Sequence, residues 1–409
     1  MSYSVDCRYI RNEKANCLKA SYVSMVKLER NILEAEEYEC GTIIPIRQEA
    51  KSSLDCGGVV TNDGKFVRSS IVPGWVTGWY DDYECIESDR TAVYCGRMIG
   101  HWGHFLLECV TRLWFFLEKD DPNYVYVFIV KEGSEPPIEG NFLQFFELLG
   151  IWNRLMFLNE ATRYRRVIVP ERSFQYKRFC SPQYVAVFDR VIDNALILKI
   201  DGSFSDKLYL SRGCFERALQ SEVGLKMLDD YFAENGYEII YPENISLIEL
   251  IHRLNAAHTC ASESGTTAHN FLFCRNKHRV IVVERQSVVN EAQASIDIVR
   301  KLRTIYLDSH LTLDCDIQPC FLYYTTYMKH MTENLGYKPP DQVYTSVETL
   351  KKNLYFYAVA YQKMHAKQSA NIVFKDHEVR CLEEAMHESQ ELLNALGFKL
   401  SVPINSSNL

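Results

Sequence analysis

Apolar runs without polar alternation recur in the first half of the chain and predict buried strands. The clearest, Tyr124-Val-Tyr-Val-Phe-Ile-Val, consists of β-branched and aromatic residues, which is typical of a strand covered on both faces. Further strands are predicted at 91–95 and 165–170, and helices at 104–118 and 142–149. Strands that alternate with helices predict a mostly parallel sheet with helices on both faces.

The same alternation restarts after residue 201. Strands are predicted at 207–213, 237–242, 258–261 and 279–284, and helices at 221–235, 246–257 and from about 266 to 273. Ser221 is a predicted N-cap, and Ser246 forms a predicted capping box with Glu249. A β-α-β-α-β-α-β unit of this kind binds nucleotides at the carboxyl ends of its strands.

These patterns divide the chain into three parts. Residues 1–200 are predicted to form an N-terminal α/β domain, and residues 201–320 a Rossmann-like domain. The first sixty or so residues are predicted to be irregular, with short strand-like pieces such as 41–46. Residues 321–409 have a helical pattern, including 346–370 and 378–396. We expect this extension to pack back on the chain or to mediate assembly into a homo-oligomer.

Composition narrows the class of protein. The chain has 409 residues, 47% of them hydrophobic, and a formal net charge of −8, which argues against bulk binding of nucleic acid. No apolar run approaches the roughly 18 residues needed to span a bilayer, and the first residues lack a secretory signal, so we expect a soluble, cytoplasmic protein. The fourteen cysteines include no Cys-x-x-Cys pair, which favours free thiols over a disulfide framework.

The predicted helix at 104–118 is mostly apolar, but three polar residues form a stripe along one of its faces. His104, Glu108 and Arg112 follow one another at i, i+4 and i+8. A histidine beside a carboxylate could remove a proton from a hydroxyl group, whereas the alternative is a structural ion pair at a domain interface. His101 lies three residues before His104, but two histidines without further ligands are a weak signal for a metal.

Two further clusters follow predicted strands of the second half. Arg212 and Arg217 lie in a glycine-containing loop and could bind a diphosphate, although such loops are more often solvated surface. The turn 264–270 places small and hydroxyl-bearing residues between a strand and a helix, where it could bind phosphate or act only as a helix cap. Glu263 and Glu284 could accept hydrogen bonds from sugar hydroxyls, or lie on the surface.

A local basic segment extends from Arg163 to Arg166 and continues at Arg172, Lys177 and Arg178. Its arginines alternate with aromatic residues. Such a segment could contact a polyanionic or lipid-phosphate acceptor or the anionic face of a membrane, and otherwise is a solvated strand flank.

Three of these segments, in order, resemble glycosyltransferase family 61. Gly103-His-Phe-Leu-Leu-Glu-Cys-Val-Thr-Arg-Leu-Trp114 is similar to the family's His-Trp-Leu-x-Asp/Glu-x-Leu-Pro-Arg-Leu helix. Leu208-Tyr-Leu-Ser-Arg212 with Arg217 and Glu222 resembles its Ile-Ser-Arg … Arg … Asn-Glu segment, and 264–273 with 280–284 resembles its last turn and strand. The resemblance covers about residues 90–290. Thr111, Ser221 and Thr267 depart from it, where the family often has Pro, Asn and Gly.

The resemblance implies a glycosyltransferase-B-like fold, with two Rossmann-like domains facing a cleft. It implies inverting transfer from a nucleotide sugar to a glycan or lipid-linked glycan acceptor, in capsule or other surface-polysaccharide biosynthesis, without an essential metal. The catalytic base would be His104 or Glu108, with His101, Arg112, Glu263 and Glu284 in support. The donor-binding residues would be Arg212, Arg217, Ser264, Gly265, Thr266, Thr267, His269 and Asn270. A cytoplasmic enzyme of this kind could also contact the inner face of a membrane peripherally.

Two other functions are compatible with the same residues. Asp314-Cys-Asp316 is the pattern that metal-dependent sugar-nucleotide enzymes use, and it would support a sugar or lipid phosphotransferase. In a non-catalytic nucleotide- or glycan-binding scaffold, the stripe of His104, Glu108 and Arg112 would be an interface network only.

Overall fold

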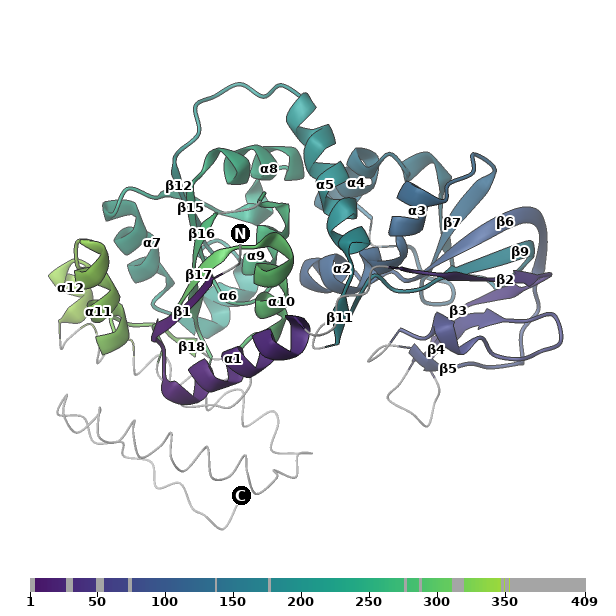
Figure 1. Ribbon diagram of the computed structural model, residues 1–409, viewed down its shortest axis with the longest axis horizontal. Coiled ribbons are helices and arrows are strands. Elements are labelled where there is room, and N and C mark those ends of the chain that lie inside the picture. Colours follow the sequence, from purple (N-terminus) through teal and green to yellow (C-terminus); the bar gives the residue numbers. More distant parts are fainter. Residues whose placement is uncertain are drawn as a thin grey trace, which may run out of the picture.

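The computed structural model describes residues 4–26, 32–48, 55–72, 76–136, 138–175, 178–275, 278–286, 289–310 and 320–346, together with residues 349 and 353. These residues form two separate large sheets flanked by helices, side by side along the longest axis of the molecule (Figure 1). We call the part around the eight-stranded sheet the first lobe and the part around the six-stranded sheet the second lobe. The predicted mixed α/β class with parallel strands is confirmed.

The first lobe contains a mixed sheet in the order β5-β4-β3-β9-β6-β7-β8, with β2 also paired to β9. Its strands are β2 (Ala35–Glu39), β3 (Thr42–Gln48), β4 (Asp55–Val60), β5 (Val76–Gly78), β6 (Ile86–Arg97), β7 (Tyr124–Ile129), β8 (Leu155–Leu158) and β9 (Thr162–Pro170). Strands β6 to β9 pair in parallel, as the apolar runs predict, whereas β2, β3 and β4 pair antiparallel. Part of the segment predicted to be irregular therefore extends this sheet.

The second lobe contains a wholly parallel sheet in the order β1-β17-β16-β15-β12-β14. Its strands are β1 (Ser4–Tyr9), β12 (Lys207–Leu210), β14 (Glu238–Ile240), β15 (Thr259–Glu263), β16 (Arg279–Glu284) and β17 (Arg303–Asp308). From β12 the chain first adds β14 on one side and then β15, β16 and β17 on the other. Such a reversal opens a crevice at the carboxyl ends of the strands, where α/β proteins bind ligands.

The N-terminal strand and helix belong to the second lobe. Strand β1 pairs in parallel with β17, and helix α1 (Asn12–Val26) packs against α10 (Glu291–Arg300). Residues 4–26 therefore lie in the second lobe and not with the rest of the predicted domain of residues 1–200. The reason is that the partner of an edge strand is set by the sheet that is open to it and not by its neighbours in the sequence.

The remaining elements cover the two sheets. The helices are α2 (Trp102–Glu108), α3 (Trp114–Glu118), α4 (Gly140–Leu149), α5 (Pro182–Ile197), α6 (Glu216–Ser221), α7 (Leu225–Glu234), α8 (Leu247–Ala256), α9 (Thr266–His269), α11 (Thr326–Leu335) and α12 (Gln342–Thr345). Short 3₁₀ turns are η1 (Arg68–Ser70), η2 (Cys109–Arg112), η3 (Trp152–Arg154), η4 (Pro242–Asn244) and η5 (Asn270–Phe273). Two small ribbons pair β10 (Phe174–Gln175) with β11 (Phe179–Cys180) and β13 (Glu222–Val223) with β18 (Cys320–Phe321).

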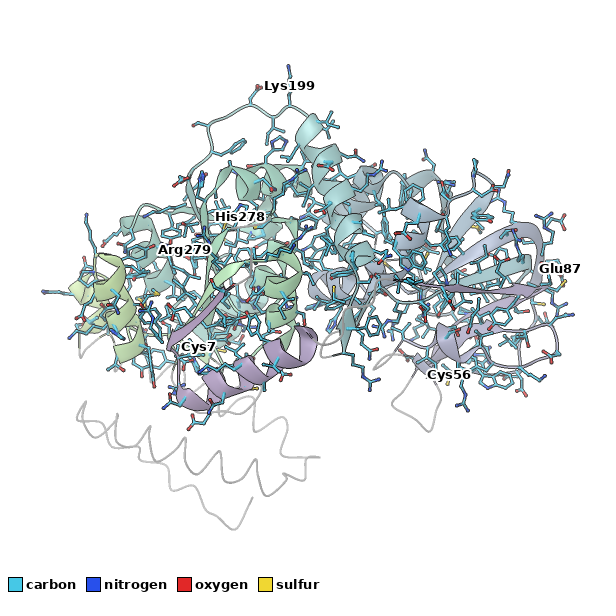
Figure 2. All side chains as sticks on the ribbon, in the orientation of Figure 1. Cys7, Cys56, Glu87, Lys199, His278 and Arg279 are labelled. Atoms are coloured by element: carbon cyan, nitrogen blue, oxygen red, sulfur yellow. The ribbon has the colours of Figure 1, made fainter. Side chains whose placement is uncertain are left out.

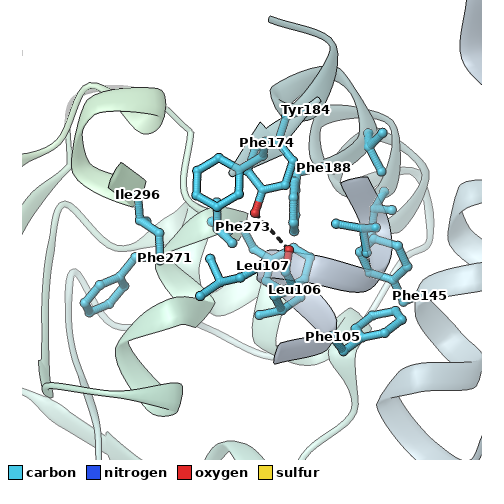
Figure 3. Packing of buried hydrophobic residues seen from close by; sticks show 14 of the residues in the cluster. Phe105, Leu106, Leu107, Phe145, Phe174, Tyr184, Phe188, Phe271, Phe273 and Ile296 are labelled. Atoms are coloured by element: carbon cyan, nitrogen blue, oxygen red, sulfur yellow. Dashed lines mark hydrogen bonds between the residues drawn. The ribbon is translucent and has the colours of Figure 1, made fainter. Parts of the chain in front are cut away.

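One apolar core joins the two lobes. The rings of Phe105 in α2 and Phe145 in α4 lie 5.1 Å apart, and Phe145 lies 6.3 Å from Phe273 in η5 (Figure 3). Helix α5 contributes Phe188, and the hydroxyl of Tyr184 donates a hydrogen bond of 2.8 Å to the Leu106 carbonyl oxygen. Buried aromatic pairs of this kind fix the helices that carry them, so α2 has a defined position at the junction of the lobes.

The structure confirms some of the predicted helix caps and contradicts others. The N-cap at Ser246 is confirmed, because its hydroxyl accepts a hydrogen bond from the Glu249 N–H. The Glu249 carboxylate accepts from Arg253, so the second half of the predicted capping box is not seen. The N-cap at Ser221 is wrong: Ser221 ends α6, and α7 begins after Gly224. The twelve described cysteines are free thiols. Asp314, Cys315, Asp316 and the predicted helix at 378–396 lie outside the described residues, as does nearly all of 346–370. No helix within the described ranges is both long and apolar enough to cross a membrane.

Candidate active site

A pocket of about 840 Å³ lies where the two lobes meet. One wall is formed by loops that follow four parallel strands of the second lobe: Arg212 and Phe215 after β12, Pro242–Ser246 after β14, Thr266, Thr267 and Asn270 after β15, and Arg285 and Gln286 after β16. The other wall is formed by Gly100–Trp102 at the start of α2 and by Glu139–Phe142 at the start of α4. The pocket thus occupies the crevice that the strand order of the second lobe creates.

Helix α2 and the turn at 264–270 touch directly across this junction. Trp102 Nε1 donates a hydrogen bond of 2.8 Å to Asn270 Oδ1. Gly103 allows the close approach, because a Cβ atom there would lie 2.8 Å from Thr266 Oγ1 and 3.0 Å from His269 Nδ1. Two of the three predicted clusters, more than 150 residues apart in the chain, therefore meet at one site.

Arg212 and Arg285 share one buried carboxylate at the pocket wall. Arg212 Nη2 donates to Glu222 Oε1 at 2.9 Å, and Arg285 Nη1 donates to the same oxygen at 2.8 Å. Burial alone would lower the pKa of Arg212, but the Glu222 carboxylate more than offsets it and raises that pKa. The two guanidiniums and the carboxylate together carry one net positive charge, and their hydrogen bonds hold them in place. This arrangement suits an anionic ligand.

Arg285 and the role of Glu222 were not predicted from the sequence. The available signal for Arg285 was its place directly after a predicted strand of the parallel sheet, where side chains reach the crevice. The Arg285 Nε also donates to the Ser264 carbonyl oxygen at 2.7 Å. Gly265 has φ +114°, a backbone conformation that favours glycine, and a Cβ there would also lie 3.0 Å from Arg285 Nη2.

The predicted donor residues do not all reach the pocket. Its lining includes Arg212, Thr266, Thr267 and Asn270 but not Ser264, Gly265 or His269 among the described residues. His269 is buried, and burial, followed by the charges of His104 and His101, lowers its pKa to about 3. It is therefore a neutral, packed side chain. The side chain of Arg217 lies outside the described part of the structure.

The predicted helix at 104–118 is interrupted, which separates its polar stripe. Helix α2 ends at Glu108, where φ is −125°, and η2 follows before α3 begins. His104 Nδ1 lies 3.5 Å from Glu108 Oε1, and the His101 and His104 rings lie 4.8 Å apart. The His104 side chain is 41% exposed, and Glu108 Oε2 is buried without a hydrogen bond to a described residue.

Arg112 turns away from this pair into the first lobe. Its guanidinium donates to the carbonyl oxygens of Ser69 and Pro170, and burial lowers its pKa. The expectation of one stripe of three residues is therefore wrong. A 3₁₀ turn advances each residue by about 120° rather than 100°, so Arg112 leaves the face of His104. Arg112 anchors η2 to the first lobe instead of supporting the pocket.

Glu263 and Glu284 end β15 and β16 and are fully buried. Burial raises the pKa of each carboxyl to about 7; a nearby carboxylate adds to the shift in each case, Glu222 for Glu263 and Asp308 for Glu284. Neither residue belongs to the pocket lining. They lie behind the loops that do, so a direct contact with a sugar hydroxyl would need these loops to move.

The raised pKa of Glu263 predicts a measurable pH dependence. The pKa of the Glu263 carboxyl is about 7 in the folded protein, against an ordinary value of 4.5. The protonated carboxyl therefore contributes stability that is fully present below about pH 4.5 and is lost as the pH rises through 7. We expect Glu263→Gln to gain up to about 3 kcal/mol in free energy of unfolding relative to the wild type between pH 5 and pH 8. Urea denaturation at several pH values measures this. The exposed Glu234→Gln serves as a control, and a pH-independent difference for Glu263→Gln would contradict the expectation.

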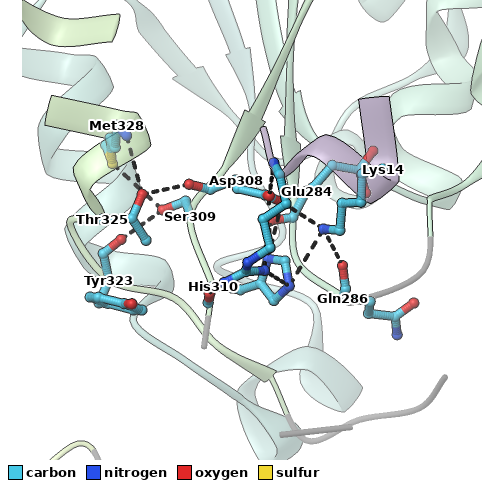
Figure 4. A network of polar contacts seen from close by, with 10 residues as sticks. Lys14, Glu284, Gln286, Asp308, Ser309, His310, Tyr323, Thr325 and Met328 are labelled. Carbon is cyan, nitrogen blue, oxygen red and sulfur yellow. Dashed lines mark hydrogen bonds and ion pairs between the residues drawn. The ribbon is translucent and has the colours of Figure 1, made fainter. Parts of the chain in front are cut away.

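A buried network connects the N-terminal helix to the pocket loop (Figure 4). Lys14 Nζ in α1 donates to Asp308 Oδ1 and to the Gln286 carbonyl oxygen, both at 2.6 Å. His310 lies beside them, and its Nδ1–H donates a hydrogen bond of 2.9 Å to the Glu284 carbonyl oxygen. Lys14 thereby holds the loop that carries Arg285 and Gln286. A segment remote from the pocket in sequence thus supports its wall.

Comparison with known families agrees with the geometry. The family model described as Glycosyltransferase 61 matches residues 102–281, from the first residue of α2 into β16. No curated protein matches the chain in a sequence search. Among the described residues, no group of three or more His, Cys, Asp or Glu side chains is arranged to hold a metal ion.

Proposed function

Since residues 102–281 belong to glycosyltransferase family 61, we propose that the protein transfers a sugar from a nucleotide sugar to a hydroxyl group of a glycan or lipid-linked glycan. The reaction would be a single displacement with inversion at the anomeric carbon. The acceptor oxygen forms the new bond as the bond to the diphosphate breaks, the acceptor proton passes to a base, and a nucleoside diphosphate leaves. The observation that carries this proposal is the one pocket shared by α2 and the strand ends of the second lobe.

The donor side of the proposal rests on Arg212 and Arg285. A leaving diphosphate must be neutralised, and two guanidiniums fixed by Glu222, with the hydroxyl groups of Thr266 and Thr267 nearby, offer fork-shaped hydrogen bonding for it. These groups could act without an essential metal. The two lobes with a pocket between them also support a glycosyltransferase-B-like arrangement.

The acceptor side of the proposal rests on His104 and Glu108. If the His104 Nδ1 proton is directed to Glu108 Oε1, 3.5 Å away, then Nε2 is the nitrogen that takes the proton of the acceptor hydroxyl. Glu108 could instead be the base itself. Among these residues His101 lines the pocket and His104 and Glu108 do not, and His101, whose ring lies 4.8 Å from that of His104, would help to position the acceptor. We further propose a role in capsule or other surface-polysaccharide synthesis on the cytoplasmic side of a membrane.

Loss of either member of this pair should reduce turnover and not nucleotide affinity. We expect His104→Ala and Glu108→Ala to lower kcat about a hundredfold, the usual effect of losing a general base, with the Kd for the nucleotide unchanged. His258→Ala is the matched control, because His258 pairs with Asp206 on the surface and outside the pocket. Variants that fold and remain fully active would exclude His104 and Glu108 as the base.

Nucleotide binding tests the proposed function itself. We expect UDP, GDP or CMP to raise the melting temperature and to bind in calorimetry with EDTA present. Arg285→Lys keeps the charge and loses the fork, so the Kd should rise about tenfold. Arg253→Lys, which alters an ion pair with Glu238 and Glu249 away from the pocket, should leave it unchanged. Absence of binding by every nucleotide and nucleotide sugar would refute the proposal.

A further inference from the structure

A second pocket, of about 660 Å³, lies at the amino-terminal ends of β7 and β8 in the first-lobe sheet. Its lining includes the central part of β6, the first residues of β7 and β8, and Arg165 of β9. The candidate active site begins beyond the other end of β6, where Arg97 precedes His101 by four residues. Extended chain from Thr91 to Arg97 spans about 20 Å. The two pockets are therefore separate, and the family comparison assigns nothing to the second.

Of the arginines that line this second pocket, one has an ion-pair partner among the described residues and two do not. Arg90, Arg154 and Arg165 all line it. Asp120 neutralises Arg154, accepting from Nη1 at 2.9 Å and from Nη2 at 2.8 Å. The guanidiniums of Arg90 and Arg165 form no hydrogen bond or ion pair with a described residue. Among the described residues of the lining, Asp89 is the one with an acidic side chain. Two unpaired guanidiniums and one carboxylate leave an excess of positive charge in the lining.

Other arginines of the same strand differ. Arg163 pairs with Glu87 at 3.0 Å and Arg166 with Glu37 at 3.2 Å, and neither lines the pocket. Glu87 lies at the outer end of the first lobe (Figure 2). The basic segment predicted from the sequence is therefore partly a paired strand flank and partly, at Arg165, the wall of a pocket.

One residue with a buried hydroxyl group belongs to the pocket lining, and a second interacts electrostatically with Arg90. Thr91 lines the pocket, yet its Oγ1 is buried and has no hydrogen-bond partner among the described residues. The hydroxyl of Tyr164 is buried in the same state, and although burial raises its pKa to about 12, the positive charge of Arg90 acts against that shift. A buried donor without an acceptor costs about 1–3 kcal/mol. Rotation of the Thr91 side chain toward the pocket would let its hydroxyl donate to a ligand oxygen and remove this penalty.

We propose that the pocket lined by Arg90, Thr91 and Arg165 binds a phosphate ester. Guanidiniums match the oxygens of a phosphoryl group in fork geometry, and the volume leaves room for the group to which the phosphate is attached. The same chemistry is offered by a phosphorylated solute and by the headgroup of an anionic phospholipid. The proposal does not depend on the proposed transferase activity.

The test compares a double variant with a matched control by calorimetry. Inorganic pyrophosphate is titrated into the full chain with the candidate active site saturated by the nucleotide that binds it, or without nucleotide if none binds. We expect Arg90→Ala/Arg165→Ala to weaken the remaining pyrophosphate binding at least tenfold. Arg163→Ala removes one positive charge from β9, the strand that carries Arg165, and should change the Kd less than twofold. All exchanged side chains are at least partly exposed, so the melting temperatures should stay close to the wild-type value.

A second experiment, with lipid vesicles, distinguishes a lipid headgroup from a soluble phosphate ester. Vesicles of phosphatidylcholine with phosphatidic acid should sediment the wild type and not the double variant if a lipid headgroup is the ligand. Pyrophosphate binding without sedimentation identifies a soluble phosphate ester. The proposal fails if wild-type protein binds neither probe, or if the double variant and Arg163→Ala lose binding equally, because that result indicates a general effect of charge.

Discussion

Replacement of Glu222 by glutamine should lower the free energy of unfolding by about 3–5 kcal/mol, the usual cost of removing one partner from a buried ion pair. The Glu222 side chain has no exposed surface and is the common acceptor of Arg212 and Arg285. An amide oxygen can still accept one hydrogen bond, but it leaves two buried guanidiniums without a counter-charge. Chemical denaturation followed by circular dichroism measures the change.

The same substitution should also disturb the pocket. Because the two guanidiniums would repel each other, we expect the nucleotide Kd to rise even under conditions where the variant is folded. Glu249→Gln is the matched control, since Glu249 pairs with Arg253 where both side chains are partly exposed. It should cost less than about 1 kcal/mol. A loss below about 1 kcal/mol for Glu222→Gln would contradict the shared role of this carboxylate.

Replacement of Gly224 by alanine should be comparably severe, for a steric reason. Gly224 follows β13 with φ +95°, and an ideal Cβ would lie 2.0 Å from the carbonyl oxygen of Leu322. A left-handed backbone costs alanine about 1–2 kcal/mol, and overpacking against backbone adds about 1–3 kcal/mol. We therefore expect a loss of about 4 kcal/mol, measured as the shift in urea midpoint.

Gly236→Ala separates the two contributions. Gly236 has φ +81° and would meet no atom within 4 Å of a Cβ, so only the backbone cost of about 1–2 kcal/mol should appear. Equal losses for Gly224→Ala and Gly236→Ala would show that the contact with Leu322 does not constrain the chain. Since Gly224 directly follows Val223 in the ribbon that contains Glu222, a severe effect would link the fold of this ribbon to the pocket.

Much of the fold could be predicted because its segments are locally encoded. The apolar runs at 124–130, 165–170 and 279–284 form strands within a residue of the predicted limits or inside a longer strand. The order of strands and helices after residue 201 gives the parallel sheet.

The details of the site could not be predicted in the same way. The pairing of Arg285 with Glu222 joins residues 63 apart, and Lys14 with Asp308 joins residues 294 apart. The break after Glu108, which sends Arg112 into the first lobe, depends on acceptors at Ser69 and Pro170 that no helical periodicity contains.

The amino-acid sequence by itself determined where the strands and helices lie and which side chains end them, because burial of each segment is written in its own spacing of apolar residues. Only the tertiary structure decided that residues 4–26 complete the second lobe, that His101 rather than His104 lines the pocket, and that two arginines share one carboxylate. These features depend on the energy of desolvating charges and of pairing an open sheet edge, and that energy is fixed by neighbours in space.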